Sequence, residues 1–221
     1  MKLFKTLVLV FCVVAIILCM GGCCMKKDSS ESSGTVVILN GPSSVGKTSI
    51  IKAFQAKQSN LWLSIGIDNF FVGVLPQRFC LEDKPEHYCV MRGVASEDKE
   101  GKLFTLIVGP DGQKVISGMH RAIAAYAKAG NNVIVDYIKY EDHWLTDLQD
   151  ALCGIKVVWV GVTAPLEVII QREKQRGTSP EGHARSHYST VHQNMSYDLM
   201  IDASMLNPEQ TADKIIEFIY R

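Results

Sequence analysis

The sequence lacks a net charge, because its 23 lysine and arginine residues equal its 23 aspartate and glutamate residues. Nucleic-acid binding depends on an excess of basic side chains, so this balance gives no electrostatic reason to expect a nucleic-acid partner. The chain also lacks internal repeats and long low-complexity stretches. Its 221 residues, 47% of them hydrophobic, suit a single globular domain with a short appendage.

Cysteine is scarce outside the N-terminus. Four of the seven cysteines fall within residues 1–24, and only Cys80, Cys89 and Cys153 belong to the rest of the chain. This odd, scattered set contains no C-x-x-C pair, which argues against a zinc site and against a disulfide framework. A bond between Cys80 and Cys89 stays open in an oxidising compartment.

Residues 1–24 follow the order of a secretory signal: lysines in MKLFK, the apolar run TLVLVFCVVAIILCM, and then GGCC. Small residues that lead into a cysteine also resemble a bacterial lipoprotein signal, with Cys23 as the lipidated residue, although Met20 stands where leucine is usual. An uncleaved membrane anchor and a translation start at Met25 stay open as alternatives. Residues 25–34, rich in lysine, serine and acidic residues, predict a flexible tether.

The alternatives for the N-terminus give different locations. A lipoprotein or an anchored protein is membrane-associated, which is the location we favour, whereas a chain that starts at Met25 is cytoplasmic. A lipoprotein signal would deliver the domain to a place where ATP is not ordinarily available. The lysines on the two sides of the apolar run balance and do not decide the orientation: Lys2, Lys5, Lys26 and Lys27.

Strand and helix patterns alternate from residue 35 to the end of the chain. The strand patterns are short runs rich in β-branched residues, at 35–40, 62–68, 131–138 and 155–162. The helical patterns lie at 47–58, 119–130, 165–177 and 207–221. This alternation predicts one α/β domain over 35–221, built on a mainly parallel sheet with right-handed crossovers.

The stretch after the first strand matches the phosphate-binding pattern G-x-x-x-x-G-K-S/T and stands between a strand and a helix, as this motif requires. Its two glycines let the backbone curl so that successive amides face an anion. Lys47 places a cation at the β- and γ-phosphates, and Thr48 offers a hydroxyl to Mg²⁺. We therefore expect ATP and Mg²⁺ as cofactors. The expected nucleotide-binding residues are Gly41, Pro42, Ser43, Ser44, Val45, Gly46, Lys47, Thr48 and Ser49.

Two aspartates follow predicted strands, at the sheet edge where ligands bind in open α/β folds. Asp68 ends SIGID, and a carboxylate there can accept a proton from an attacking hydroxyl, as a kinase requires. The alternative is that Asp68 only caps the following helix. Asp136 ends VIVD, the position of a carboxylate for Mg²⁺, its water or the substrate; the alternative is a turn aspartate.

Arg172 and Arg176 lie one helical turn apart in QREKQRG and face the same way. This spacing can close two guanidinium groups over a phosphoryl group during its transfer. The alternative is an ordinary solvated helix face, shared with Glu173 and Lys174.

These motifs together resemble the chloramphenicol phosphotransferase-like kinases. The resemblance covers most of residues 35–205 and rests on VVILNGPSSVGKTSI, WLSIGIDNF, AKAGNNVIVDYI, VVWVGV, REKQRG and VHQNMSYDLMIDAS, in order and similarly spaced. It implies a P-loop kinase-like three-layer sandwich, with helices on both faces of the sheet. It also implies an ATP-dependent kinase that phosphorylates a hydroxyl of a small molecule.

On this resemblance, Asp68 corresponds to the general base of the family, and Lys47 and Thr48 correspond to its phosphate and Mg²⁺ contacts. Arg172 and Arg176 correspond to its lid. Four further residues match family positions, and we assign them to scaffolding around the last strand: His192, Tyr197, Asp198 and Asp202.

The chain departs from the family pattern in two places. After REKQRG the family has a further basic residue very soon, whereas here the next arginine is Arg185. Residues 76–118 are longer than the matching stretch, and we expect them to form the lid or wall of the acceptor pocket. The acceptor therefore need not be chloramphenicol. Four side chains of this segment are candidates to line the pocket: Arg78, Tyr88, Arg92 and Phe104.

Three functions follow from these observations. The leading one is an ATP-dependent kinase for the hydroxyl of a small molecule. A nucleoside, nucleotide or shikimate-type kinase shares the loop and the arginine pair, and tight binding of AMP or a nucleoside would favour it. The third is an exported lipoprotein that binds nucleotide without turnover, against which the presence of Lys47, Thr48, Asp68 and Asp136 argues.

Overall fold

The computed structural model describes residues 33–76, 79 and 90–221, and Ser33–Arg221 forms one compact unit. The predictions for residues 1–32 and for the pair Cys80 and Cys89 lie outside the described residues and stay predictions, as do those for Arg78 and Tyr88. In the part of the chain that is described, no helix combines the length and the apolar character needed to cross a membrane.

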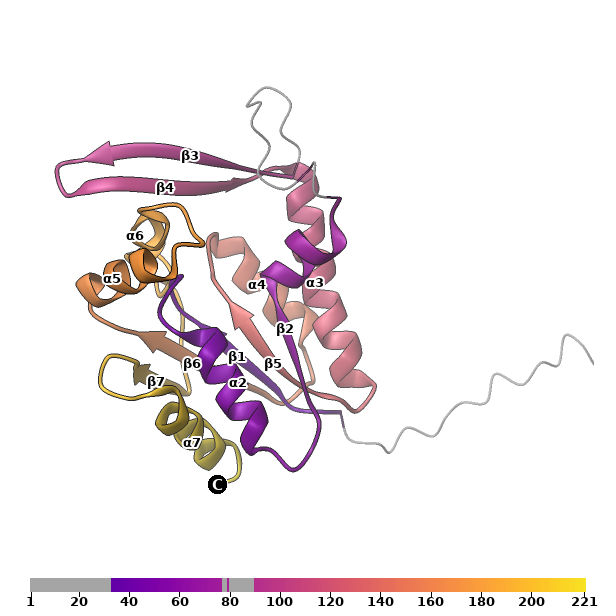
Figure 1. The fold of residues 1–221 in the computed structure, drawn as a ribbon. Helices are drawn as coiled ribbons and strands as arrows, with labels where there is room; N and C mark the ends of the chain where they lie inside the picture. The colour runs from indigo at the N-terminus through magenta and orange to yellow at the C-terminus, as the bar shows by residue number, and fades with distance from the viewer. Residues whose placement is uncertain (1–32, 77–78, 80–89) are drawn as a thin grey trace, which may run out of the picture. The chain divides into compact units, whose positions relative to one another are not determined.

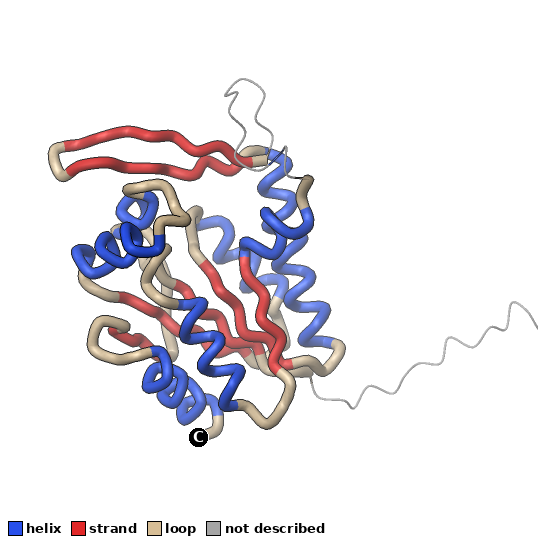
Figure 2. Tube along the Cα trace, in the orientation of Figure 1, coloured by secondary structure: helices blue, strands red, loops and turns tan. Residues whose placement is uncertain are grey.

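Five parallel strands form the central sheet in the order β2-β5-β1-β6-β7, which confirms the predicted α/β fold (Figure 2). Their bounds are β1 Val36–Asn40, β2 Trp62–Gly66, β5 Asn132–Tyr137, β6 Val157–Thr163 and β7 Leu199–Asp202. All five residues of β1 are buried, as expected of a central strand that is covered on both faces. The order places β1 and its following loop between the ends of β5 and β6.

Helices cover both faces of this sheet, so the three-layer arrangement is confirmed (Figure 1). Successive side chains of a strand point to opposite faces, and accordingly Val37 and Leu39 enter one apolar cluster while Val36 and Ile38 enter the other. The first cluster is closed by α2 (Lys47–Lys57), α5 (Leu166–Arg176), α6 (His183–Tyr188) and α7 (Pro208–Ile219). The second is closed by α3 (Pro110–Lys128), α4 (Asp142–Ala151) and the π-helix η1 (Asn69–Val74).

Two antiparallel strands, β3 (Met91–Asp98) and β4 (Gly101–Val108), form a hairpin outside the central sheet. Figure 1 shows it extending past α6 from the N-terminal end of α3. At its base, the Gly109 amide donates to the carbonyl of Val90 at 2.8 Å. All side chains of the two strands are half-buried or exposed, so the hairpin is held by its contacts with neighbouring elements rather than by a core of its own.

The helix expected to begin near Met119 begins at Pro110, so the predicted start is wrong by about two and a half turns. The stretch PDGQKVISG contains proline and two glycines and therefore looks like a loop. Pro110 instead occupies the first turn, where a missing amide proton costs nothing. A Cβ on Gly112 would lie 2.1 Å from the Val90 carbonyl oxygen, so this glycine lets α3 approach the hairpin base.

Candidate active site

The phosphate-loop motif forms the connection between β1 and α2. Its backbone turns through two left-handed residues, Ser44 with φ 61° and Gly46 with φ 110°. The buried Lys47 ammonium donates to the carbonyls of Gly41 at 2.9 Å and Pro42 at 3.0 Å. Burial lowers the pKa of Lys47, while nearby carboxylates act in the opposite direction. Because the first amides of a helix have no partner within it, the start of α2 adds partial positive charge to the loop.

Asp136 lies inside β5, next to β1, and contacts the phosphate loop directly. Its Oδ2 accepts from the Thr48 hydroxyl at 2.8 Å, and its Oδ1 lies 3.4 Å from the Lys47 Nζ. The alternative of a turn aspartate is therefore wrong. A hydroxyl and a carboxylate are the hard oxygen donors that Mg²⁺ prefers, and Mg²⁺ usually keeps waters and phosphate oxygens as its other ligands. This donor set fits Mg²⁺ bound with a nucleotide, and the described residues contain no group of three or more acidic, histidine or cysteine side chains that could hold a metal alone.

Asp68 follows β2 by two residues and reaches the same edge of the sheet, since Gly66 of β2 pairs with Asp136 of β5. The strand ends earlier than predicted, and Asp68 already has helical backbone angles. Its side chain makes no cap hydrogen bond to η1, so the capping alternative is not what the structure shows. The Asp68 carboxylate is exposed, and its charge raises the pKa of Lys47.

The two arginines of α5 are held differently. Arg172 donates from Nη1 to the Val45 carbonyl and from Nη2 to the Ala203 carbonyl, both at 2.9 Å. It thus ties the phosphate loop to the residue that follows β7. Arg176 is exposed and donates to the hydroxyl of Ser179, and its charge contributes to lowering the pKa of Lys47. Both arginines therefore lie near the loop, but only the Arg176 guanidinium is free of backbone contacts.

The alternative of a solvated helix face that includes Glu173 and Lys174 is wrong for Glu173, which is 2% exposed. Its carboxylate accepts from the amides of Gly182 at 2.9 Å and Ala184 at 2.7 Å, and so caps the start of α6. Lys174 is exposed, and its Nζ lies 3.9 Å from the Glu181 carboxylate.

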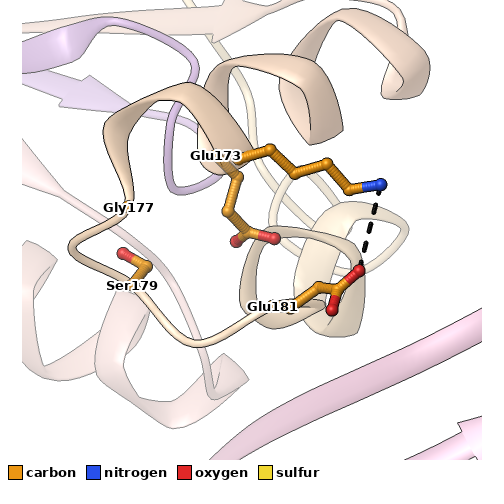
Figure 3. Close-up of a pocket in the computed structure, with 5 residues that line it drawn as sticks. Glu173, Gly177, Ser179 and Glu181 are labelled. Atoms are coloured by element: carbon orange, nitrogen blue, oxygen red, sulfur yellow. Dashed lines mark ion pairs between the residues drawn. The ribbon is translucent and has the colours of Figure 1, made fainter.

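An open hollow of about 340 Å³ lies in the turn between α5 and α6 (Figure 3). Its lining residues are Glu173, Lys174, Gly177, Ser179 and Glu181. None of them belongs to the phosphate loop or to the ends of β2 and β5. The hollow is therefore a feature of the turn beside the site and is not the site itself.

Two histidines of α6 belong to the site although sequence reasoning missed them. The Ser43 amide of the phosphate loop donates to Nε2 of His187 at 3.0 Å. The Nε2 of His183 lies 2.8 Å from the Tyr140 hydroxyl, and its ring stacks on Phe104 of the hairpin with centroids 6.3 Å apart. The available signal was their spacing of four residues in HARSH, which places both on one helix face.

The hairpin packs against α6, the helix that carries the two histidines of the site. The Phe104 amide donates to the Gly182 carbonyl at 3.2 Å, and Arg185 donates to the carbonyls of Gly101 and Lys102 at 2.8 and 3.1 Å. A Cβ on Gly182 would lie 2.3 Å from the Lys102 carbonyl oxygen, so glycine is needed for this close approach. Arg185, which the sequence marked only as a departure, thus joins the hairpin to α6.

The residues expected to serve as scaffolding lie beneath the site. Asn40, at the end of β1, donates to the Tyr197 hydroxyl at 2.6 Å, and that hydroxyl lies 2.7 Å from Nδ1 of His192. Asp198 accepts from the Trp159 amide at 2.8 Å. Asp202 ends β7, and its carboxylate accepts from the amide and hydroxyl of Ser204. The prediction of a hydrogen-bonded structural histidine is thus met by His192, which is linked through the Tyr197 hydroxyl to the end of the strand that leads into the loop.

Comparisons with known proteins agree with this geometry. A family model described as "Chloramphenicol phosphotransferase-like protein" matches residues 34–220. Two proteins of Mycobacterium tuberculosis, from strains CDC 1551 / Oshkosh and H37Rv, bear the name "Putative O-phosphotransferase". Each is 33% identical over 185 residues, which is 83% of this chain and 81% of the relative.

Solved structures share the fold at low sequence identity. The APS kinase CysC of M. tuberculosis, in complex with AMPPNP and APS, superposes with a TM-score of 0.59 and 15% identity, over 86% of this chain and 99% of its own. The tunicamycin resistance protein of Deinococcus radiodurans superposes with a TM-score of 0.57 and 17% identity, over 84% and 95%. A gluconokinase of Sinorhizobium meliloti 1021 gives 0.53 and 14%, over 85% and 96%.

Proposed function

The chain belongs to the chloramphenicol phosphotransferase-like family, and we propose that it transfers the γ-phosphate of ATP to a hydroxyl group of a small molecule. The observation that carries this proposal is the convergence of three groups at one edge of the sheet. Lys47 fills the phosphate loop, the Thr48 hydroxyl bonds Asp136, and the exposed Asp68 stands at the end of the neighbouring strand. Phosphoryl transfer needs mainly positioning and charge stabilisation, and this set supplies both.

The phosphate loop has the groups to bind the triphosphate. In the proposed complex, the Lys47 ammonium leaves its carbonyl partners and contacts the phosphate oxygens, and the amides at the start of α2 contribute their partial charge. Thr48 and Asp136 would hold Mg²⁺, which neutralises charge on the phosphates when bound. The Arg176 guanidinium, which the backbone does not hold, contacts the transferring phosphoryl group. Arg172 acts indirectly, because its guanidinium donates to the Val45 carbonyl and so positions the loop rather than the phosphoryl group.

Asp68 is the proposed general base. Its carboxylate is exposed at the sheet edge and close enough to Lys47 to raise the pKa of that ammonium. An acceptor hydroxyl placed between Asp68 and the γ-phosphate gives its proton to the carboxylate as the new oxygen–phosphorus bond forms. The bond from the γ-phosphorus to the bridging oxygen breaks, and ADP leaves.

The hairpin is the proposed wall of the acceptor pocket. Phe104 and His183 stack between the hairpin and α6, and Tyr140 bonds His183 from the loop after β5. This combination of rings and a few polar atoms suits an acceptor with an apolar body, for which a chloramphenicol-like alcohol is a candidate.

We also keep membrane association through residues 1–24 as a proposal, supported by their sequence alone.

The proposal is tested by incubating the full chain with ATP and Mg²⁺ and a panel of hydroxylated small molecules, and by detecting phosphorylated product by mass. The panel contains chloramphenicol, related alcohols, simple sugars, shikimate and nucleosides. Product on an alcohol that depends on Asp68 supports the proposal, and product on a nucleoside or shikimate moves the chain to that kinase class. ATP binding without product on any acceptor would favour the non-catalytic alternative. Absence of ATP binding would overturn the nucleotide assignment.

A further inference from the structure

A buried hydrogen bond joins the phosphate loop to α6. Ser43 is 7% exposed and His187 is 3% exposed, and the Ser43 amide donates to the imidazole Nε2 at 3.0 Å. The two residues lie 144 positions apart in the sequence. The acceptor of this loop amide is therefore the His187 side chain. This residue belongs neither to the phosphate-loop motif nor to the proposed chemistry.

The bond determines which nitrogen of the neutral imidazole carries the proton. Because Nε2 accepts the hydrogen bond from the Ser43 amide, the proton of the neutral ring is on Nδ1. The Ser186 hydroxyl lies 3.4 Å from Nδ1 and itself donates to the His183 carbonyl at 2.7 Å, which leaves its oxygen able to accept from Nδ1. Burial, together with His183 and Lys47 nearby, lowers the pKa of His187 to about 3, so the ring is neutral near pH 7.

The surroundings fix this ring in one position. The rings of Tyr140 and His183 pack edge-on against it, with centroids 4.9 and 5.0 Å away. The helix that carries it is capped by the buried Glu173 carboxylate, and the Tyr188 hydroxyl donates to the Ala164 carbonyl at 3.0 Å. His187 is therefore a rigid acceptor, held by residues outside the loop.

The loop needs such support next to Ser43. Ser44 adopts the left-handed φ of 61°, which residues with a side chain rarely adopt and which persists only when the surroundings enforce it. The bond at Ser43 orients the peptide that enters this turn. Within the turn, the Val45 amide donates to the Pro42 carbonyl at 3.4 Å. A loop that is already in its bound shape loses less conformational freedom when it binds an anion.

We propose that His187 is a positioning residue for nucleotide binding: its neutral imidazole holds the Ser43 amide and keeps the phosphate loop in the shape that receives a triphosphate. The inference rests on the proposed function, because it requires that the loop bind phosphate. It adds a residue from outside the motif to the determinants of nucleotide affinity.

Calorimetric titration of the full chain with ATP, and separately with inorganic pyrophosphate, in the presence of Mg²⁺ tests this inference. His187→Leu keeps an apolar side chain but removes the acceptor, and we expect both ligands to bind about tenfold more weakly. His187→Gln places an amide oxygen near the position of Nε2 and should restore affinity to within about threefold of the wild type. A purely structural role would not predict this rescue.

His120→Leu is the matched control, because His120 is equally buried but bonds Asp147 and Tyr137 on the other face of the sheet. It should lower the melting temperature and leave pyrophosphate affinity within about twofold. If His187→Leu does not fold, His187→Asn, whose shorter amide cannot reach Ser43, takes its place. Wild-type affinity in His187→Leu, or equal weakening in His187→Gln, would overturn the inference. A wild-type chain that binds neither ligand would overturn the proposed function itself.

Discussion

The phosphate loop and the β3–β4 hairpin face each other across α6 but are built in different ways. The loop follows the fully buried strand β1 and leads into α2, which core side chains such as Phe54 hold against the sheet. The hairpin has no core of its own and depends on close backbone approaches at Gly112 and Gly182 and on the bonds of Arg185. The part that handles nucleotide is thus integral to the fold, whereas the part proposed to contact the acceptor is attached to it.

This difference leads to different expectations for substitutions in the two regions. The loop follows the central strand β1 and leads into Lys47 and Thr48, so substitutions there change groups proposed to contact the nucleotide. The hairpin lies outside the central sheet, so its side chains can change without disturbing that sheet. The comparison predicts that substitutions at the loop and sheet edge alter transfer and ATP binding, while substitutions in the hairpin alter use of the acceptor.

The largest effect is expected at the sheet edge, from Asp68→Asn. The amide cannot accept the acceptor proton, so the transfer rate should fall by about 10²- to 10⁴-fold while ATP affinity stays within about twofold. Rate measurements with an acceptor from the panel, combined with calorimetry for ATP, check this. Asp150→Asn, at an exposed carboxylate on α4, is the control. Near-normal transfer by Asp68→Asn would refute the general-base assignment.

The two arginines of α5 should separate into one with a kinetic and one with a structural effect. Arg176→Ala removes an exposed guanidinium and should lower the transfer rate by about 100-fold without a change in melting temperature. Arg172→Ala leaves the Val45 and Ala203 carbonyls without their donor and should lower the free energy of unfolding by about 2 kcal/mol. Rates and urea denaturation of both variants test the division. Equal stability losses in the two variants would contradict it.

Lys47→Ala should weaken ATP binding by about 10- to 100-fold, because it removes a charged hydrogen-bond donor from the phosphate site. Its removal leaves the Gly41 and Pro42 carbonyls without their donor but also removes the cost of burying the ammonium, so the melting temperature should fall by less than that of Arg172→Ala. Calorimetry and thermal denaturation measure both quantities. Lys52→Ala, at an exposed position of the same helix, provides the comparison. Unchanged ATP affinity in Lys47→Ala would count against the phosphate-loop assignment.

A substitution in the hairpin should have the opposite pattern. Phe104→Ala removes the ring that stacks on His183 and should raise the KM for the acceptor by about tenfold, with less than a twofold change in the KM for ATP. Steady-state kinetics with each substrate varied in turn give both values. Thr105→Ala, at the next and exposed position of β4, should change neither. A larger effect on ATP than on the acceptor would remove the proposed division between the two regions.

The smallest effect concerns pH. Burial lowers the pKa of four histidines: His120, His183, His187 and His192. The unfolded chain therefore binds protons that the folded chain does not, between about pH 6.5 and the lower folded pKa, which is about 3 for His187. The free energy of unfolding must then fall as the pH falls through this window.

Each such histidine contributes at most about 1.4 kcal/mol per pH unit to this slope. His187→Gln removes one of them and should flatten the slope of unfolding free energy between pH 6 and pH 4 by up to that amount. Urea denaturation at several pH values, with the wild type measured in parallel, gives the two slopes. Identical slopes would mean that burial does not lower the pKa of His187 in the folded protein.

The sequence by itself determined the phosphate loop, the alternation of strands and helices, and the two aspartates at the carboxyl ends of β2 and β5. These features are local: a phosphate-loop turn between a buried strand and a helix follows from neighbouring residues, and a strand-end carboxylate follows from the direction of a parallel strand. Where local signals were ambiguous, the prediction was wrong. The glycines and the proline near Pro110 indicated a loop, but packing against the hairpin base made them part of α3.

Only the tertiary structure decided which distant residues complete the site. Strand order brought Asp136 to Thr48, although they are 88 residues apart, and packing of α5 gave Arg172 two backbone carbonyls rather than solvent. The same packing buried Glu173 and placed His187 on the phosphate loop. Hydrogen bonds over such separations depend on how the layers stack, and no local pattern of residue types specifies that.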